Sequence, residues 1–378
     1  MDFNHSETRQ MLADTLGRFV LQDYPLTERL AAGASEIGYS PEKWEQLAEL
    51  GVIGALFSEK DGGFGGAGFD LAVVFEAIGR GLICEPFLQS GVLAGGLLAA
   101  AGNDTQKSHM DALIAGEYIA VLAHAEANDG GDPAFIETTA EQSGSGWVLN
   151  GHKAVIRHGA SANLLVVSAR TSGKAGDQHG MSLFLVPKNA TGLGYQKYQT
   201  IDGGGAADIS LENVQLDAGA LLGGEGQGVA LLEVTLGRGL LAISAEALGI
   251  MDVIKDMTIE YIQTRKQFGV PIGKFQALQH RMAEMLMEIE QARSAVINAA
   301  AHVDGTGPAR ERALSAAKFT IGQVGTLVAE ESIQLHGGIG MTWEHSLGHF
   351  AKRLVMIGHE LGDEDYHLAR YMRLGAPA

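Results

Sequence analysis

The segment Arg265–His280 reads Arg-Lys-Gln-Phe-Gly-Val-Pro-Ile-Gly-Lys-Phe-Gln-Ala-Leu-Gln-His, and its glycines and proline interrupt a long helical pattern. The pattern predicts a helix that ends, turns and restarts as a second helix. Arg265, Gln267 and Phe268 bring a cation, an amide and an aromatic ring to that turn. An arginine can form two parallel hydrogen bonds with a phosphate, and a phenylalanine can cover a planar ring system. An ordinary helix–turn–helix connection with an exposed arginine explains the same composition, so both interpretations stay open here.

A second glycine-rich segment, Gln-Leu-His-Gly-Gly-Ile-Gly from Gln334 to Gly340, follows the next long helical run. Backbone without side chains can approach a ligand closely, and amide groups at a helix start can face a phosphate. The pair Gly337–Gly338 also suits a simple helix cap followed by a loop. The flanking residues Gln334 and His336 favour a binding role.

The residues around these two segments predict a helical C-terminal domain over residues 225–378. Met282, Met285 and Ile289 form an apolar stripe at helical spacing, and Ala313–Leu335 is a long run rich in alanine. Few prolines or glycines interrupt either run. Long paired helices of this kind form bundles.

Residues 118–224 have a different character, because short runs rich in β-branched or aromatic residues alternate with turn residues. That pattern predicts a β-sandwich or β-barrel domain. Asn150–Gly151 predicts a hairpin, since both residues tolerate the positive φ of a type I′ turn. The expected strands are Tyr118–Leu122, Phe135–Thr139, Trp147–Leu149, Ala154–Ile156, Leu164–Ser168 and Ser182–Val186.

Residues 1–117 again predict helices, and they complete an α+β fold with the order helix, sheet, helix. Ser40 followed by Pro41 is a typical helix start, with a capping hydroxyl before a proline in the first turn. Further helices are expected over Phe69–Gly81 and Phe87–Ala101. We therefore expect an N-terminal helical domain over residues 1–117, a β-domain over 118–224 and a helical bundle over 225–378.

The net charge of −18 excludes several classes of function. It would repel a nucleic-acid backbone and disfavours binding to anionic membranes. The one cysteine, Cys84, excludes an intrachain disulfide and cysteine-ligated zinc or iron–sulfur sites, and no spacing of histidines indicates another metal site. The N-terminus does not resemble a signal peptide, and the apolar run Val229–Leu248 carries charges. A cytoplasmic protein without membrane insertion is expected.

Gly63–Gly68 fits the pattern G-x-G-x-x-G, which would indicate a nicotinamide-dependent oxidoreductase. That function needs a preceding strand inside a βαβ unit. Here the preceding segment is predicted to be helical and no β–α alternation follows, so a structural loop is favoured.

The segments at 265–280 and 334–340, in this order, resemble the acyl-CoA dehydrogenase family. Ser58–Gly65, Trp147–Lys153 and Leu183–Pro187 are similar to further family segments, so the resemblance covers essentially the whole chain. It implies a C-terminal four-helix bundle and FAD-dependent oxidation of an acyl-CoA thioester to the 2-enoyl-CoA. It also implies an acyl-CoA substrate, an electron-transfer flavoprotein as electron acceptor, and a tetramer.

The resemblance also implies which residues bind FAD. Arg265 and Phe268 would contact the diphosphate and adenine portion across a subunit interface. Gln334, Gly337 and Gly338 would reach the same cofactor from the partner chain. By the same resemblance, two further positions lie beside the flavin ring. They hold Ala125 and Arg157 where family members carry hydroxyl groups.

The catalytic base is where the sequence departs most from the family. Many members carry the base as the Glu of a Glu-Gly-Thr sequence, and matching on Gly362 places Leu361 there. Glu360 and Asp363 are the nearest carboxylates. Other members carry the base just before an arginine on the first C-terminal helix, where this chain has Gly237.

Three explanations remain open. Glu360 or Asp363 serves as the base through a shifted loop, or the chain is the non-catalytic partner subunit that completes the FAD site of a heteromeric acyl-CoA dehydrogenase. Alternatively, the chain has diverged to another use of flavin and thioester. A solvated helix start also explains the acidic run Glu360–Asp365, because carboxylates favour the N-terminal end of a helix.

Overall fold

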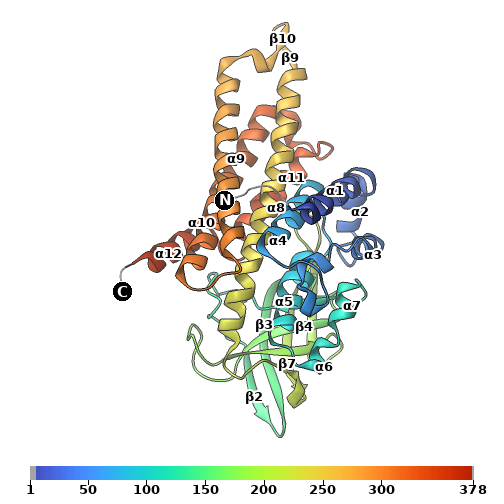
Figure 1. The fold of residues 1–378 in the computed structure, drawn as a ribbon, viewed down its shortest axis with the longest axis vertical. Coiled ribbons are helices and arrows are strands. Elements are labelled where there is room, and N and C mark those ends of the chain that lie inside the picture. Colours follow the sequence, from blue (N-terminus) through green and yellow to red (C-terminus); the bar gives the residue numbers. More distant parts are fainter. Residues whose placement is uncertain (1–5, 377–378) are drawn as a thin grey trace. The chain divides into compact units, whose positions relative to one another are not determined.

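The computed structural model describes residues 6–376 (Figure 1). The chain forms two compact units. Among the described residues, the first combines 6–26, 67–83 and 240–376, and the second combines 27–66 and 84–239. Helix α8 (Gly228–Thr264) begins in the second unit and continues into the first.

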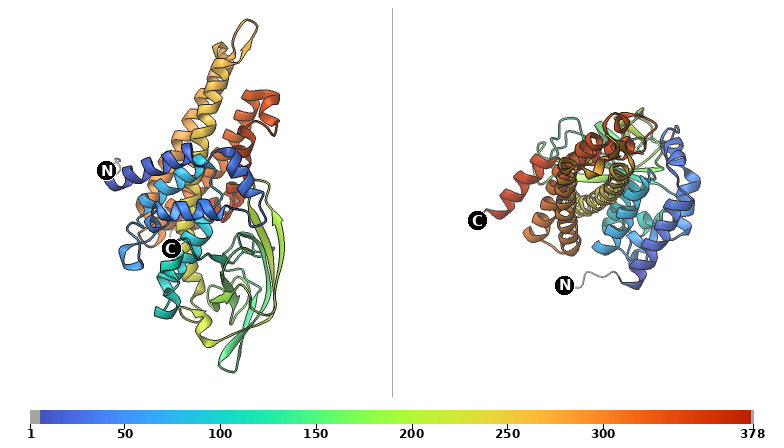
Figure 2. Two further views of the ribbon diagram at one scale, coloured as in Figure 1. Left: turned by 90° about the vertical axis from the view of Figure 1, so that its right-hand side faces the viewer. Right: turned by 90° about the horizontal axis from the view of Figure 1, so that it is seen from above.

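The first unit is helical. Figures 1 and 2 show α8 and α9 running side by side toward the small hairpin β9–β10. Its core consists of aliphatic side chains from α4, α8, α9 and α10, among them Leu71, Ile250, Ile289 and Leu314. Besides α8, its elements are α1 (Glu7–Gln22), α4 (Gly68–Gly81), β9 (Lys266–Gln267), β10 (Val270–Pro271), α9 (Gln276–His302), α10 (Pro308–His336), α11 (Leu347–His359) and α12 (Glu364–Gly375).

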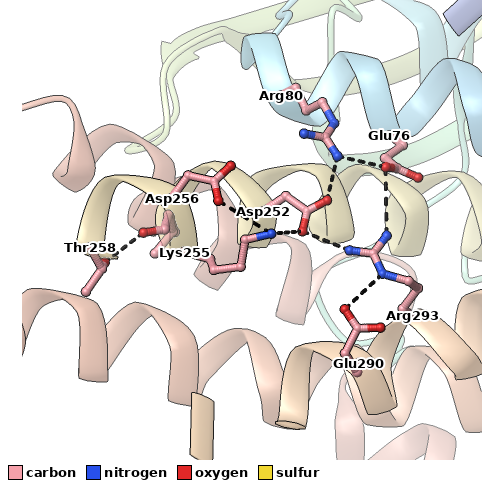
Figure 3. Close-up of polar contacts among 9 residues, drawn as sticks. Glu76, Arg80, Asp252, Lys255, Asp256, Thr258, Glu290 and Arg293 are labelled. Atoms are coloured by element: carbon pink, nitrogen blue, oxygen red, sulfur yellow. Dashed lines mark hydrogen bonds and ion pairs between the residues drawn. The ribbon is translucent and has the colours of Figure 1, made fainter. Parts of the chain in front are cut away.

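A network of ion pairs joins three helices of this unit (Figure 3). Asp252 on α8 accepts hydrogen bonds from Arg80 on α4 at 2.5 Å and from Arg293 on α9 at 2.8 Å. Lys255 lies one turn further along α8 and donates to the same carboxylate at 2.9 Å. Burial raises the pKa of Asp252, but Lys255, Arg293 and Arg80 outweigh it, so the pKa lies below its ordinary value.

Helix α8 is long and apolar enough to cross a membrane by length and composition alone, but 67% of its most apolar window is buried inside the structure. That burial is what a core helix requires, and a single helix of this kind is weak evidence for a membrane span.

The second unit contains helices and a mixed eight-stranded sheet with the order β6-β7-β3-β2-β4-β5-β8, in which β1 pairs with β4 in parallel. Its helices are α2 (Leu26–Gly33), α3 (Pro41–Glu49), a π-helix (Phe87–Ala94), α5 (Gly95–Ala101), α6 (Asp104–Lys107) and α7 (Met110–Ile114). Its strands are β1 (Ala120–Ala123), β2 (Thr139–Ser143), β3 (Gly146–Arg157), β4 (Leu164–Arg170), β5 (Met181–Pro187), β6 (Leu193–Gln199), β7 (Gly205–Leu216) and β8 (Leu221–Leu222).

The predicted α+β order of helix, sheet and helix is confirmed. The predicted helix start at Ser40 is also confirmed, because its hydroxyl accepts a hydrogen bond from the Lys43 backbone N–H. The hairpin predicted at Asn150–Gly151 is wrong. Strand β3 continues through both residues with a register shift, and the turn lies at Gly144–Ser145 instead.

A second correction concerns the strand expected at Phe135–Thr139. Of this segment only Thr139 lies in a strand. The backbone N–H groups of Glu137 and Thr138 donate to the buried Glu126 carboxylate at 2.7 and 3.1 Å. They are therefore used by a side chain and not by a neighbouring strand.

Candidate functional site

The turn at Arg265 is a short hairpin between α8 and α9. Strands β9 and β10 pair across Phe268 and Gly269, which both have positive φ, and the Ile272 N–H donates to the Arg265 carbonyl at 2.8 Å. Phe268 is 91% exposed, and a side chain placed on Gly269 would meet no atom within 4 Å. The hairpin therefore presents an aromatic ring and a cation to an open surface.

The segment Gln334–Gly338 ends helix α10 in a sharp bend. Gly337 has a φ of 67°, and its N–H donates to the Gln334 carbonyl as a helix cap. Gln334, Gly337 and Gly338 are exposed, and added side chains at either glycine would meet nothing within 4 Å. Bare backbone at this bend is therefore open to close approach by a ligand.

His336 lies under this bend and is buried. Its Nδ1 lies 2.8 Å from the Ser332 carbonyl, so Nδ1 carries the hydrogen and Nε2 carries the lone pair. Nε2 is buried and has no hydrogen-bond partner within residues 6–376. The ring stacks on Tyr261 at 4.5 Å, and burial lowers the pKa of His336.

A buried polar network lies at the end of β1, next to Ala125. Lys153 is fully buried, and its Nζ donates to Glu126 at 2.7 Å, to Ser168 at 3.1 Å and to the His124 carbonyl at 3.2 Å. Burial lowers the pKa of Lys153 to about 8, although Glu126 opposes the shift. Burial and the Lys153 charge lower the pKa of His124 to about 3. The network fixes the backbone of residues 124–126.

Neither predicted flavin-facing side chain offers a hydroxyl group. The Ala125 side chain is a methyl group, and the Ala125 carbonyl accepts from the Ala154 N–H at 2.9 Å. Arg157 Nη1 donates to both oxygens of Asp202, at 3.1 and 3.3 Å, and the Asp202 side chain is fully buried. Sequence reasoning missed Asp202, because nothing in its neighbourhood indicates an arginine 45 residues away.

The loop that follows α11 holds Leu361 at a φ of 56° and Gly362 at 92°. Lys318 donates to the carbonyls of Gly358 and Gly362 at 2.9 and 2.7 Å, and His367 donates to the Leu361 carbonyl at 2.9 Å. Burial lowers the pKa of Lys318 to about 8. These bonds hold the loop in one conformation.

Both carboxylates predicted as catalytic have structural partners. Glu360 pairs with Arg353 at 2.6 Å, and Arg353 also binds Glu246 at 2.6 and 2.9 Å. Asp363 caps helix α12, because its side chain accepts from the Tyr366 N–H at 2.9 Å. Gly237 lies inside α8, next to Arg238, which donates to the Gly66 carbonyl at 2.6 Å.

The loop Gly63–Gly68 is structural. The N–H groups of Phe64, Gly65 and Gly66 donate to carbonyls within residues 54–57, so these amides do not face a phosphate. A side chain on Gly63 would collide with the carbonyl oxygens of Gly54 and Phe57. The nicotinamide hypothesis therefore loses its basis. Within the described part of the chain, no group of three or more potential ligands could hold a metal ion.

Models of the acyl-CoA dehydrogenase N-terminal, middle and C-terminal domains match residues 6–117, 121–214 and 226–373. The chain belongs to the acyl-CoA dehydrogenase family. It is 30% identical to a probable acyl-CoA dehydrogenase, YngJ, of Bacillus subtilis, over 95% of this chain and 96% of that protein. It is 32% identical to mitochondrial isovaleryl-CoA dehydrogenase of Pongo abelii, over 93% of this chain and 85% of the relative.

The chain is also similar to a chain in the solved structure of the ChsE4-ChsE5 complex from Mycobacterium tuberculosis. The TM-score is 0.89, the identity is 26%, and the match covers 100% of this chain and 100% of that chain. Family membership makes this acyl-CoA dehydrogenase an FAD-dependent oxidoreductase that acts on acyl-CoA, in a family whose members are typically tetramers. The domain boundaries at residues 117 and 224 and the individual site residues stay predictions.

The residues of this chain fit the two parts of FAD unequally. The hairpin and the bend fit a nucleotide, because the glycines are open and His336 offers an unpartnered acceptor. The side chains at the flavin-facing positions do not fit the ring in the family's manner. The Ala125 side chain has no polar atom, and the Arg157 side chain is bound to Asp202.

Proposed function

We propose that this acyl-CoA dehydrogenase takes part in converting an acyl-CoA thioester to the 2-enoyl-CoA as the base-lacking subunit of an assembly with a related chain. The observation that carries the proposal is the set of side chains in the loop around Leu361. The loop has no carboxylate at the family's base position, and the two carboxylates beside it are engaged in an ion pair and a helix cap.

The reaction removes a proton from the α-carbon and a hydride from the β-carbon. When bound, FAD supplies the acceptor for that hydride. The proton needs a carboxylate that is free to accept it. The Glu360 carboxylate accepts hydrogen bonds from Arg353 at 2.6 and 3.4 Å, so both of its oxygens are engaged by the guanidinium. The related chain would therefore supply the base, while this chain supplies the hairpin at Arg265 and the bend at Gly337.

The second candidate is a self-sufficient enzyme that uses Glu360. One observation favours this candidate. Arg353 also binds Glu246 through two hydrogen bonds, so Arg353 would keep a carboxylate partner if Glu360 moved away from it. In that case the chain would form a homotetramer. Under either candidate, an electron-transfer flavoprotein is the proposed acceptor and the cytoplasm the proposed location.

The similarity to a chain of the ChsE4-ChsE5 complex supports the assembly with a related chain. The test is to purify this chain alone and together with a related acyl-CoA dehydrogenase chain that carries a glutamate at the position of Leu361. Flavin bleaching by acyl-CoA is then followed without oxygen. We expect bleaching only in the co-purified protein, and Glu360→Gln should leave its rate within about twofold. Full turnover by the isolated chain, abolished by Glu360→Gln, would establish the second candidate instead.

A further inference from the structure

The end of strand β3 carries a positive charge at a position where the family resemblance expects a hydroxyl group. Arg157 is the last residue of β3, and its guanidinium lies against the turn formed by residues 200–204. Asp202 holds it from that turn with a fully buried carboxylate. Releasing Arg157 would remove a partner from this buried charge, so the pair resists separation.

The turn itself is fixed from its other side. Arg29 is buried, and its Nη2 donates to the Asp202 carbonyl at 2.5 Å. A side chain placed on Gly204 would stand 3.4 Å from Arg157 Nη2, so the backbone of the turn packs closely against the guanidinium. Arg157 is therefore committed to this turn.

The second flavin-facing position adds no polar side chain. Ala125 has a methyl side chain, and its carbonyl already accepts the Ala154 N–H. The backbone of residues 124–126 is held in place by the fully buried Lys153. A flavin ring has heteroatoms that require hydrogen bonds, and a hydroxyl can both donate and accept them. Neither Ala125 nor Arg157 offers a hydroxyl group to the flavin ring.

We infer that the pair Arg157–Asp202, together with Ala125, excludes the flavin ring from the β-sheet unit of this chain. Such a chain recognises only the adenosine diphosphate part of FAD, through the hairpin at Arg265 of one protomer and the bend at Gly337 of its neighbour. The inference extends the proposed function: in the assembly, the ring lies on the sheet of the related chain.

The test compares the affinities of the isolated chain for ADP and for FAD by calorimetric titration. We expect the two dissociation constants to agree within about threefold, and bound FAD to keep the visible spectrum of the free cofactor. Binding of FAD more than tenfold tighter than ADP, with a shifted flavin spectrum, would overturn the inference.

A variant tests the residues themselves. Ala125→Thr, Arg157→Thr and Asp202→Asn are combined, because removing both charges leaves no buried carboxylate without its partner. The preference for FAD over ADP should rise at least tenfold. The control is Lys197→Thr. Lys197 lies on β6 and forms an exposed ion pair with Glu36, and its loss should leave the preference for FAD over ADP unchanged. A folded triple variant with unchanged preference contradicts the inference.

The FAD content of the co-purified assembly is measured in every case, so the inference is tested even if the triple variant does not fold. One FAD per two chains supports the inference, and one FAD per chain overturns it. The proposed function fails separately. If the assembly needs the related chain for turnover but holds one FAD per chain, only this inference is overturned. If the isolated chain binds FAD much more tightly than ADP and turns over by itself, the inference and the proposed function are both overturned.

Discussion

Replacing Asp252 by asparagine should destabilise the helical unit by about 2–3 kcal/mol. Breaking a buried ion pair by removing one partner costs about 3–5 kcal/mol. The Asp252 side chain is 3% exposed, and it accepts from Arg80, Lys255 and Arg293. These three cations are partly exposed and can rehydrate in the variant, which places the expected cost below that range, at about 2–3 kcal/mol.

Glu290→Gln is the matched control. Glu290 is 68% exposed and pairs with the same Arg293 at 3.3 Å (Figure 3). Exposed pairs contribute little, so its loss should cost less than about 0.5 kcal/mol. The assay is urea unfolding at fixed protein concentration, in which a changed midpoint with an unchanged slope reports stability. Equal costs for the two variants, or a cost below about 0.5 kcal/mol for Asp252→Asn, would refute the reasoning.

The stability difference between the native protein and Asp252→Asn should also depend on pH. The folded protein lowers the pKa of Asp252 below the ordinary value of 3.8, so the folded state holds the carboxylate charged to lower pH than the unfolded state does. Its contribution to stability is therefore fully present above the ordinary value and is lost as the pH falls through the folded value. The advantage of the native protein over Asp252→Asn should shrink in that acid range.

Three further substitutions test the site. Lys153→Met should cost about 3–5 kcal/mol in urea unfolding, because it leaves Glu126 buried without its cation, and Lys153→Met with Glu126→Gln should recover part of that cost. Arg265→Ala should weaken ADP binding at least tenfold in calorimetric titration, whereas Lys274→Ala in the same connection should change it less than twofold. Lys318→Met removes two bonds to the loop at 358–362, so hydrogen exchange of that loop should accelerate without a change in the far-UV spectrum.

The helices and the order of the domains follow from local pattern. Ser40–Pro41 predicted a helix start correctly, because a cap depends only on neighbouring residues. The hairpin predicted at Asn150–Gly151 was wrong because residues that form a turn also suit a bulge, and the pairing of β3 with β7 decides between the two. The turn between two helices was predicted at Phe268–Gly269, but the pairing of β9 with β10 across it was not.

The partners of the site residues could not be predicted from the sequence. Arg157 and Asp202 are 45 residues apart, and Arg353 and Glu246 are 107 apart. No local spacing links residues at such separations, and the fold alone brings them together. The motifs therefore identified the positions of interest, whereas the ion pairs that engage Glu360 and Arg157 required the structure.

The central proposal is that this acyl-CoA dehydrogenase depends on a related chain for its catalytic base. Exchange of the acyl-CoA α-proton tests it most directly, because that step needs the base but no hydride transfer. The isolated chain is incubated with acyl-CoA in deuterium oxide, and deuterium at the α-carbon is followed by mass spectrometry. We expect no exchange above the rate in buffer, and rapid exchange with the co-purified assembly. Rapid exchange by the isolated chain, lost in Glu360→Gln, would contradict the proposal.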